Sequence, residues 1–147
     1  LTLIKSGIEP NPETDQEEHY FTYSLYPHAG NWREGNTVRE AAKLNQPAYT
    51  VAGGSDKLNF SLLSTNAGHV MVETVKCAES GSSMIIRVYD YQNRRGPVSI
   101  KLNGRISSVT ECDLLENDLY AVDHSYSSFD FYIKPYEIKT FKVEFGK

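Results

Sequence analysis

The chain has 147 residues, which is enough for one domain or two small ones that bury a core without help from disulfides. A formal net charge of −4 at pH 7 leaves no broad basic surface of the kind that binds nucleic acid by releasing counterions. No apolar stretch approaches the roughly 18 residues that a membrane-spanning helix needs. We therefore expect neither a nucleic-acid partner nor a membrane partner.

The first patterned segment is residues 19–28, HYFTYSLYPH, which carries two histidines and four aromatic side chains. Aromatic residues are favoured in strands, so this composition predicts a strand that bears a recognition surface. Residues 9–18 before it are polar, contain two prolines and show no periodicity. They predict an exposed loop.

One short helix is predicted at about residues 37–45. Thr37 is followed three residues later by Glu40, a capping-box pattern in which Thr37 is the N-cap residue. Pro47 prevents the helix from continuing. The residues expected to face inward are Val38, Ala41 and Ala42.

The rest of the chain alternates apolar and polar residues with a period of two, which is typical of half-buried strands. Turn-forming Gly, Asn and Ser separate the alternating segments. We expect an all-β fold: an antiparallel, immunoglobulin-like β-sandwich with one short helix. The alternating apolar residues are Phe60 and Leu62; Val70 and Val72; Ile86 and Val88; Val98, Ile100 and Leu102; Phe129, Phe131 and Ile133; and Phe141, Val143 and Phe145.

Two connections between strands follow from turn chemistry. Asn103 and Gly104 both tolerate the positive φ of a two-residue hairpin turn. Segments 98–102 and 106–109 should therefore be antiparallel neighbours. Pro135 cannot donate to a central ladder, so the last long apolar run is expected to break there.

The cysteines and histidines show no metal-binding pattern. Cys77 and Cys112 are 35 positions apart in apolar surroundings, which favours reduced, buried thiols over a redox or zinc pair. The four histidines lack the His-x-x-x-His or Glu-x-x-His spacing that would converge them on one helix face. We expect no metal site and no cofactor site in this chain.

Several segments resemble the C-terminal region of α-mannosidases of glycoside hydrolase family 38, and they follow one another in the family's order. In these enzymes a similar "ETVK…AE" strand precedes a similar "RLYE" strand and an Arg-Gly turn. Similar "ecDLLE" and "PfEIKT" segments lie near their end. The matching residues here are 1–6, 19–28 and 38–41; 73–76, 78–79, 85–89 and 95–96; and 111–116 and 135–140.

The resemblance implies that the chain is a fragment of a longer enzyme. Residues 1–50, with the short helix, would be the closing segment of the family's large β-domain, and residues 51–147 its terminal β-sandwich. The parent would be a retaining α-mannosidase that hydrolyses terminal α-mannosides, with its aspartate nucleophile and zinc ligands in an N-terminal α/β domain. No part of this chain resembles that domain. No catalytic or metal-binding residue is therefore carried over, and we expect the chain alone to be inactive.

The resemblance also implies the partners. These are the N-terminal catalytic domain and the upstream β-domains of the same polypeptide, which the chain would brace, together with the mannoside substrate of the parent. Because upstream strands would cover residues 1–30, we expect exposed apolar edges there in this chain. Few cysteines and a closer likeness to bacterial-type members imply a cytoplasmic location.

One loop is a candidate for contact with the sugar. The resemblance places residues 10–19 near the sugar site of the parent, across a domain interface. The candidate substrate-proximal residues are Asp15, Gln16 and His19. Family members commonly have glycine where this chain has Glu17, which changes both backbone freedom and charge. A solvated loop without a role in binding is the other interpretation.

Two other functions remain open. The chain would be an independent carbohydrate-binding module if it carried an exposed row of aromatic side chains. It would be a structural or adhesion β-sandwich module if it showed no connection to sugar and no buried interface. Trp32, with Tyr20, Tyr23 and Tyr26 nearby in sequence, would provide a platform for stacking on a pyranose. Burial of Trp32 against the helix is the alternative.

Overall fold

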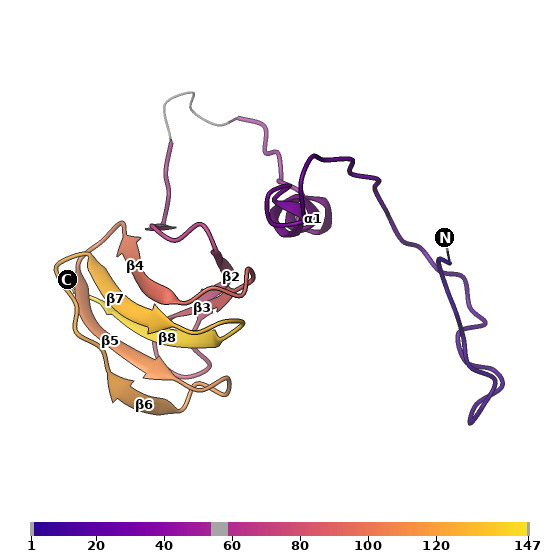
Figure 1. Cartoon of the computed structure of the whole chain (residues 1–147). Helices are drawn as coiled ribbons and strands as arrows, with labels where there is room; N and C mark the ends of the chain where they lie inside the picture. Colours follow the sequence, from indigo (N-terminus) through magenta and orange to yellow (C-terminus); the bar gives the residue numbers. More distant parts are fainter. Residues whose placement is uncertain (1, 54–58, 147) are drawn as a thin grey trace. The chain divides into compact units, whose positions relative to one another are not determined.

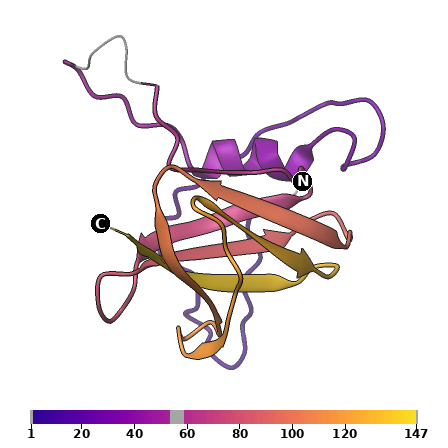
Figure 2. The same cartoon turned by 90° about the vertical axis from the view of Figure 1, so that its left-hand side faces the viewer.

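A computed structural model describes residues 2–53 and 59–146; Leu1, residues 54–58 and Lys147 lie outside the described residues. The chain divides into two compact units, Leu1–Pro47 and Ala48–Lys147. Figures 1 and 2 show the chain from two sides, coloured along the sequence from indigo to yellow.

The first unit begins with an extended segment that forms no strand among its described residues. The strand predicted at residues 19–28 is therefore wrong for this chain. An extended segment becomes a strand only when its backbone N–H and C=O groups pair with a neighbour, and here they have no such ladder. The prediction of exposed apolar side chains in residues 1–30 is confirmed. Those exposed are Leu3, Ile4, Ile8, Tyr20, Phe21, Tyr23, Leu25 and Tyr26.

Helix α1 spans Thr37–Asn45 and is the helix of the first unit. Its N-cap residue is Asn36, in the left-handed region with φ 53°, and no side chain caps the helix, so the predicted N-cap Thr37 is wrong. Glu40 does not complete a capping box, because its carboxylate pairs with Lys43 at 2.7 Å. No residue of α1 is buried, so the predicted inward-facing side is also wrong.

The second unit is an antiparallel β-sandwich, which confirms the all-β fold with one short helix. Its smaller sheet has the strand order β1-β4-β7, and its larger sheet has the order β2-β3-β8-β5-β6. All pairings are antiparallel. The strands are β1 (Leu63–Thr65), β2 (Val70–Cys77), β3 (Met84–Asp90), β4 (Gly96–Leu102), β5 (Ile106–Cys112), β6 (Asp118–Ala121), β7 (Ser128–Ile133) and β8 (Ile138–Phe145).

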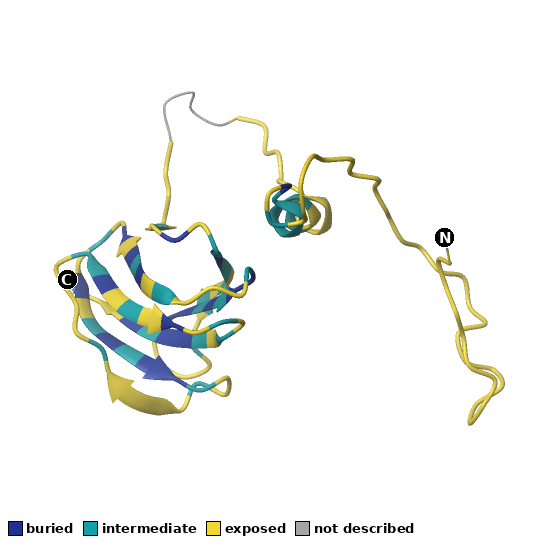
Figure 3. Ribbon diagram, in the orientation of Figure 1, coloured by how far each residue is buried: buried dark blue, intermediate teal, exposed yellow. Residues whose placement is uncertain are grey.

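The core lies between the two sheets and is filled by alternating apolar residues of both, whereas Phe60, Leu62 and Phe145 of the predicted pattern are exposed. Three phenylalanines meet at its centre: the ring centroids of Phe129 and Phe141 are 5.0 Å apart, and those of Phe131 and Phe141 are 4.6 Å apart. Tilted aromatic pairs at this spacing add to the free energy gained by burial. Figure 3 shows the buried residues concentrated on the central strands. The other buried core residues are Ala67, Val70, Ile86, Val88, Val98, Ile100, Leu102, Ile106, Val109, Ile133 and Val143.

The predicted hairpin at Asn103 and Gly104 is wrong. Strand β4 belongs to the smaller sheet and β5 to the larger one, so this connection crosses between the sheets. Neither residue has a positive φ. The glycine is needed for space instead, because a Cβ at position 104 would lie 3.1 Å from ring carbons of Phe145.

We therefore expect Gly104→Ala to lower the free energy of unfolding by about 1 kcal/mol, the lower end of the cost of overpacking. Chemical denaturation of the two proteins measures the difference. Gly68→Ala is the matched control, because a Cβ at Gly68 meets no atom within 4 Å. Equal losses in both variants would contradict the role assigned to the Phe145 contact.

The connection between β7 and β8 matches the sequence prediction. Strand β7 ends at Ile133 and β8 begins at Ile138, and the chain changes sheet through a turn that contains Pro135. Glu137 N donates a hydrogen bond to Lys134 O at 3.1 Å and closes this turn. The proline thus lies where no ladder hydrogen bond is required.

The two cysteines differ in environment. Cys112 is buried, its Sγ lies 3.6 Å from Thr140 O, and burial raises the pKa of its thiol. Cys77 is exposed, so the prediction of two buried thiols is wrong for this residue. It is the last residue of β2, an edge strand, where one side of the chain faces solvent.

Candidate functional site

The loop of residues 10–19 has a defined internal geometry. Asn11 organises it: Asn11 O accepts hydrogen bonds from Thr14 N at 3.2 Å and Thr14 Oγ1 at 2.8 Å, and Asn11 Oδ1 accepts one from Glu13 N at 3.1 Å. Asp15 follows in the left-handed region with φ 58°. Asn and Asp are the non-glycine residues that tolerate this conformation best. The loop is therefore a built turn.

The three candidate residues of this loop are all exposed. Gln16 Nε2 donates a hydrogen bond to Pro12 O at 2.7 Å, and His19 Nε2 lies 3.0 Å from Asp15 O. The structure thus brings His19 to the backbone of Asp15, whereas the side chain of Gln16 bonds at the other end of the turn. Both contacts fix the loop backbone and leave the Asp15 carboxylate facing solvent. Contact with a sugar stays a prediction.

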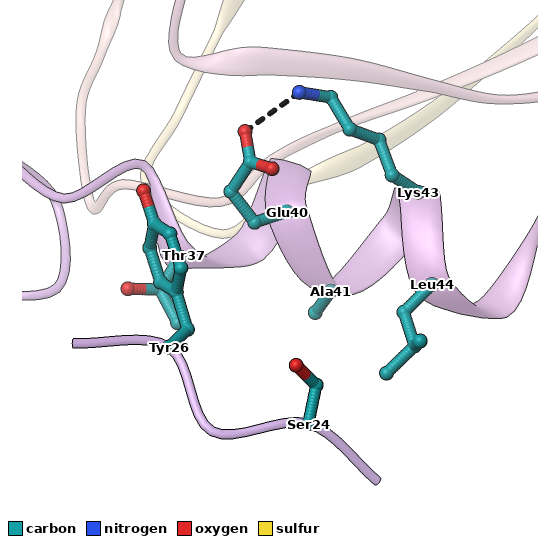
Figure 4. A pocket seen from close by; sticks show the side chains of 7 residues that line it. All are labelled: Ser24, Tyr26, Thr37, Glu40, Ala41, Lys43 and Leu44. Carbon is teal, nitrogen blue, oxygen red and sulfur yellow. Dashed lines mark hydrogen bonds and ion pairs between the residues drawn. The ribbon is translucent and has the colours of Figure 1, made fainter. Parts of the chain in front are cut away.

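A groove of about 370 Å³ lies in the first unit, between the extended segment and α1. Figure 4 shows the side chains that line it, with the ion pair between Glu40 and Lys43 at its rim. Tyr26 forms one end and donates a hydrogen bond from its hydroxyl to Gly35 O at 3.1 Å. Sequence analysis did not predict this groove, because it had assigned the helix side chains to a core. The lining residues are Ser24, Tyr26, Thr37, Glu40, Ala41, Lys43 and Leu44.

The aromatic side chains of the first unit do not form one platform. Trp32 is half-exposed, and the guanidinium of Arg33 lies 4.5 Å from the centroid of its ring, so a cation occupies one face of the indole. Tyr26 packs on His28 with ring centroids 5.5 Å apart. The hydroxyl of Tyr20 bonds to Glu18 at 2.6 Å, which raises the pKa of Tyr20. Stacking of these residues on a sugar stays a prediction.

Three of the four histidines make local side-chain contacts, whereas Nε2 of His69 is buried without a hydrogen-bond partner among the described residues. His28 Nε2 lies 3.3 Å from Thr37 Oγ1, and His124 Nδ1 lies 2.9 Å from Ser125 O. Within residues 2–53 and 59–146, no group of three or more His, Cys, Asp or Glu side chains could hold a metal ion. The described residues therefore offer no set of ligands for zinc. Nor does any described helix have the length and apolarity to cross a membrane.

Two antiparallel sheets packed face to face define this protein's larger unit as a β-sandwich domain. Residues 69–141 match the family model described as "Glycosyl hydrolases family 38 C-terminal beta sandwich domain". The β-sandwich of this chain is therefore a C-terminal domain of the glycosyl hydrolase family 38 type. This confirms the resemblance found in the sequence.

Named relatives agree with this assignment. Alpha-mannosidase G of Dictyostelium discoideum is 31% identical over 152 residues, which cover 97% of this chain and 14% of that protein. Alpha-mannosidase 2C1 of Homo sapiens is 30% identical over 121 residues, covering 79% of this chain and 12% of that protein. The chain thus spans only a small part of the length of these curated relatives. The similarity to Alpha-mannosidase G also includes the first unit.

Proposed function

We propose that this chain is the C-terminal part of an α-mannosidase that hydrolyses terminal α-mannosides. The observation that carries the proposal is the 31% identity to Alpha-mannosidase G, which extends over 97% of the chain and so includes both units. The catalytic carboxylates and the zinc ion of such an enzyme would lie in the preceding domains. The chain itself would supply packing surface and one loop.

The bracing role is supported by the exposed apolar side chains of the first unit. Leu25 is 85% exposed and Tyr20 is 86% exposed, although both belong to an aromatic segment with the composition of a strand. Apolar segments of this kind are stable when neighbouring strands cover them. The upstream β-domain of the same polypeptide is the partner that we propose for this segment. Residues 1–47 would then complete a sheet that begins outside the chain.

The loop role is supported by the geometry around Asp15. The hydrogen bonds of Gln16 and His19 to the loop backbone hold the turn in one shape, and the Asp15 carboxylate is left facing solvent. A carboxylate on a turn of fixed shape would accept hydrogen bonds from sugar hydroxyls at a lower entropic cost than one on a flexible loop. We propose that the loop contacts the mannoside in the full-length enzyme.

The test uses the full-length parent and an α-mannoside substrate. Asp15→Ala is expected to lower kcat/KM by about 3- to 10-fold, the loss that one hydrogen bond to substrate of about 1 kcal/mol predicts. Gln16→Ala and His19→Ala should give smaller losses, because they act through the shape of the loop. Glu13→Ala, which removes a neighbouring exposed carboxylate, is the matched control. Unchanged kcat/KM in all three variants would reject the loop role, whereas absence of hydrolysis by the parent itself would reject the enzyme.

A further inference from the structure

Residues 113–119, which comprise the connection from β5 and the first two residues of β6, present three leucines to solvent. Leu114 is 58% exposed, Leu115 is 82% exposed and Leu119 is 57% exposed. Single exposed leucines are ordinary, but three within six residues form an apolar surface of the kind that marks an interaction site. We call residues 113–119 the leucine segment.

The shape of the leucine segment is fixed from within by Asp113. Its carboxylate accepts hydrogen bonds from Leu115 N at 2.8 Å, Asn117 N at 2.9 Å and Asn117 Nδ2 at 2.9 Å. The bond from the Asn117 side chain, with those from the backbone, holds the pKa of Asp113 below its usual value. The leucines thus lie on a closed turn.

Side chains from other strands hold the same turn from outside. Arg87 on β3 donates from Nη2 to Leu114 O at 3.1 Å, and Lys142 on β8 donates from Nζ to Glu116 O at 3.0 Å. The Glu116 side chain is only 8% exposed, and its carboxylate pairs with Lys76 at 2.7 Å and accepts a bond from the backbone N of Glu79 at 2.8 Å. The Glu116 side chain is therefore turned inward, while the leucines face outward. Such preorganisation lowers the entropic cost of docking.

The leucine segment leads into an open sheet edge. Strand β6 is last in the order of the larger sheet, and all four of its residues are exposed, as Figure 3 shows. Its sequence, DLYA, contains neither the lysine nor the proline that commonly protects an open edge from pairing. An apolar surface next to an open sheet edge is typical of a site that another segment covers.

We infer that the leucine segment and β6 form the docking surface for the part of the parent polypeptide that precedes this chain. This inference rests on the proposed function. The curated relatives devote 86% or more of their length to regions outside the match, so a parent of similar length would hold a large covering partner within the same polypeptide. Lys76 and Lys142 are already paired with Glu116 and Asp118 inside the domain, which leaves apolar side chains as the contact. Apolar contacts of this kind are typical of permanent interfaces.

Amide hydrogen exchange of the full-length parent and of the 147-residue chain tests the inference. Amides of residues 113–121 are expected to exchange at least about tenfold more slowly in the parent, because a covered edge opens less often. Amides of the exposed turn at residues 92–95 should exchange equally in both. Equal exchange at 113–121 would overturn the inference. Exchange at 113–121 that is already slow in the chain alone, and that becomes slower as the protein concentration rises, would also overturn the inference. The surface would then be covered by a second copy of the chain.

A pair of matched variants separates docking from folding. Leu115→Glu in the parent should restore fast exchange at 113–121, whereas Tyr126→Glu, at a residue 72% exposed outside the leucine segment, should not. In the chain alone both variants should unfold like the wild type. Hydrolysis of an α-mannoside by the same parent sample tests the proposed function separately. An active parent in which Leu115→Glu leaves the exchange slow would overturn this inference and leave the proposed function intact.

Discussion

Asp90→Ala is expected to lower the free energy of unfolding of the β-sandwich by about 3 kcal/mol. Asp90 is the last residue of β3 and is buried, with only 1% of the residue exposed. It accepts hydrogen bonds from the backbone N of Tyr136 at 2.9 Å, of Arg94 at 3.1 Å and of Gln92 at 3.3 Å. Alanine would leave these donors without their acceptor, and each buried donor without a partner costs about 1 kcal/mol or more. Urea denaturation, monitored by circular dichroism, measures the loss.

The effect should be large because Asp90 joins two connections that are far apart in sequence. It ties the turn after β3 to the turn between β7 and β8, where Tyr136 is held at a positive φ of 56°. A tyrosine in this conformation is strained and needs support from its surroundings. Asp90→Asn keeps one acceptor oxygen and should lose about half as much. Asp130→Ala, at an exposed carboxylate on β7, should change stability by less than about 0.5 kcal/mol. A loss below about 1 kcal/mol for Asp90→Ala would contradict this role.

The strands of the sandwich were predictable because burial imposes a period of two on each of them. Ile100, Phe129 and Phe141 were assigned to the core from alternation alone, and all three are buried. The pairing of β4 was not predictable in the same way. A local Asn-Gly signal indicates a hairpin, but which sheet each strand joins is decided by packing across the whole core.

Side-chain contacts across the sequence were beyond the reach of local patterns. The bonds of Asp90 to Tyr136 and of Arg87 to Leu114 join residues 46 and 27 positions apart. No local pattern indicates such pairs. The strand predicted at residues 19–28 failed for a related reason, because strand formation depends on a partner and the composition of one segment cannot supply it. The family resemblance, by contrast, depends on residues in order and was confirmed.

The family resemblance pointed to the loop of residues 10–19 as a candidate site. The structure then gave the hydrogen bonds within this loop. Polar composition and two prolines predicted an exposed loop at residues 9–18, and the described residues there are exposed. The hydrogen bond of Gln16 to Pro12 O was not predictable, because glutamine occurs in many loops without such a bond. The leucine segment escaped prediction as well, since "DLLE" alone does not indicate which of its residues face solvent.

Glu111 and Lys139 form an ion pair on the core-facing side of the larger sheet. Glu111 is opposite the buried Phe141 in the register of β5 and β8, and Lys139 is opposite the buried Val88 in the register of β3 and β8. The Nζ and Oε1 atoms are 2.6 Å apart, and each side chain is 11% exposed. Burial is the largest single effect and would lower the pKa of Lys139, but the hydrogen bond to Glu111 and the nearby negative charges together outweigh it, so the pKa is raised. Lys139 is therefore charged in the folded state at neutral pH.

Glu111→Leu is expected to lower the free energy of unfolding by about 2 to 4 kcal/mol, because it leaves the Lys139 ammonium without its counter-charge in a largely buried position. Lys139→Met should cost a similar amount by stranding the carboxylate. Removing both charges in the double variant should restore stability to within about 1 kcal/mol of the wild type, because the desolvation cost of both ions is removed together. Urea denaturation of the four proteins gives the coupling free energy of this cycle.

The same cycle shows whether the ion pair of Glu111 and Lys139 contributes to the stability of the fold. If the losses of the two single variants simply add in the double variant, the pair does not interact in the folded state and the contact at 2.6 Å carries no stability. If the double variant matches the wild type in stability, apolar residues can replace the pair, and stability does not explain why these charges lie beside the core. Tyr120 provides a second readout, because its hydrogen bond to Glu111 raises the pKa of the phenol. The titration of Tyr120 should therefore shift to lower pH in Glu111→Leu. The shift should persist in the double variant even where stability is restored, because both variants lack the carboxylate that raises the pKa of Tyr120.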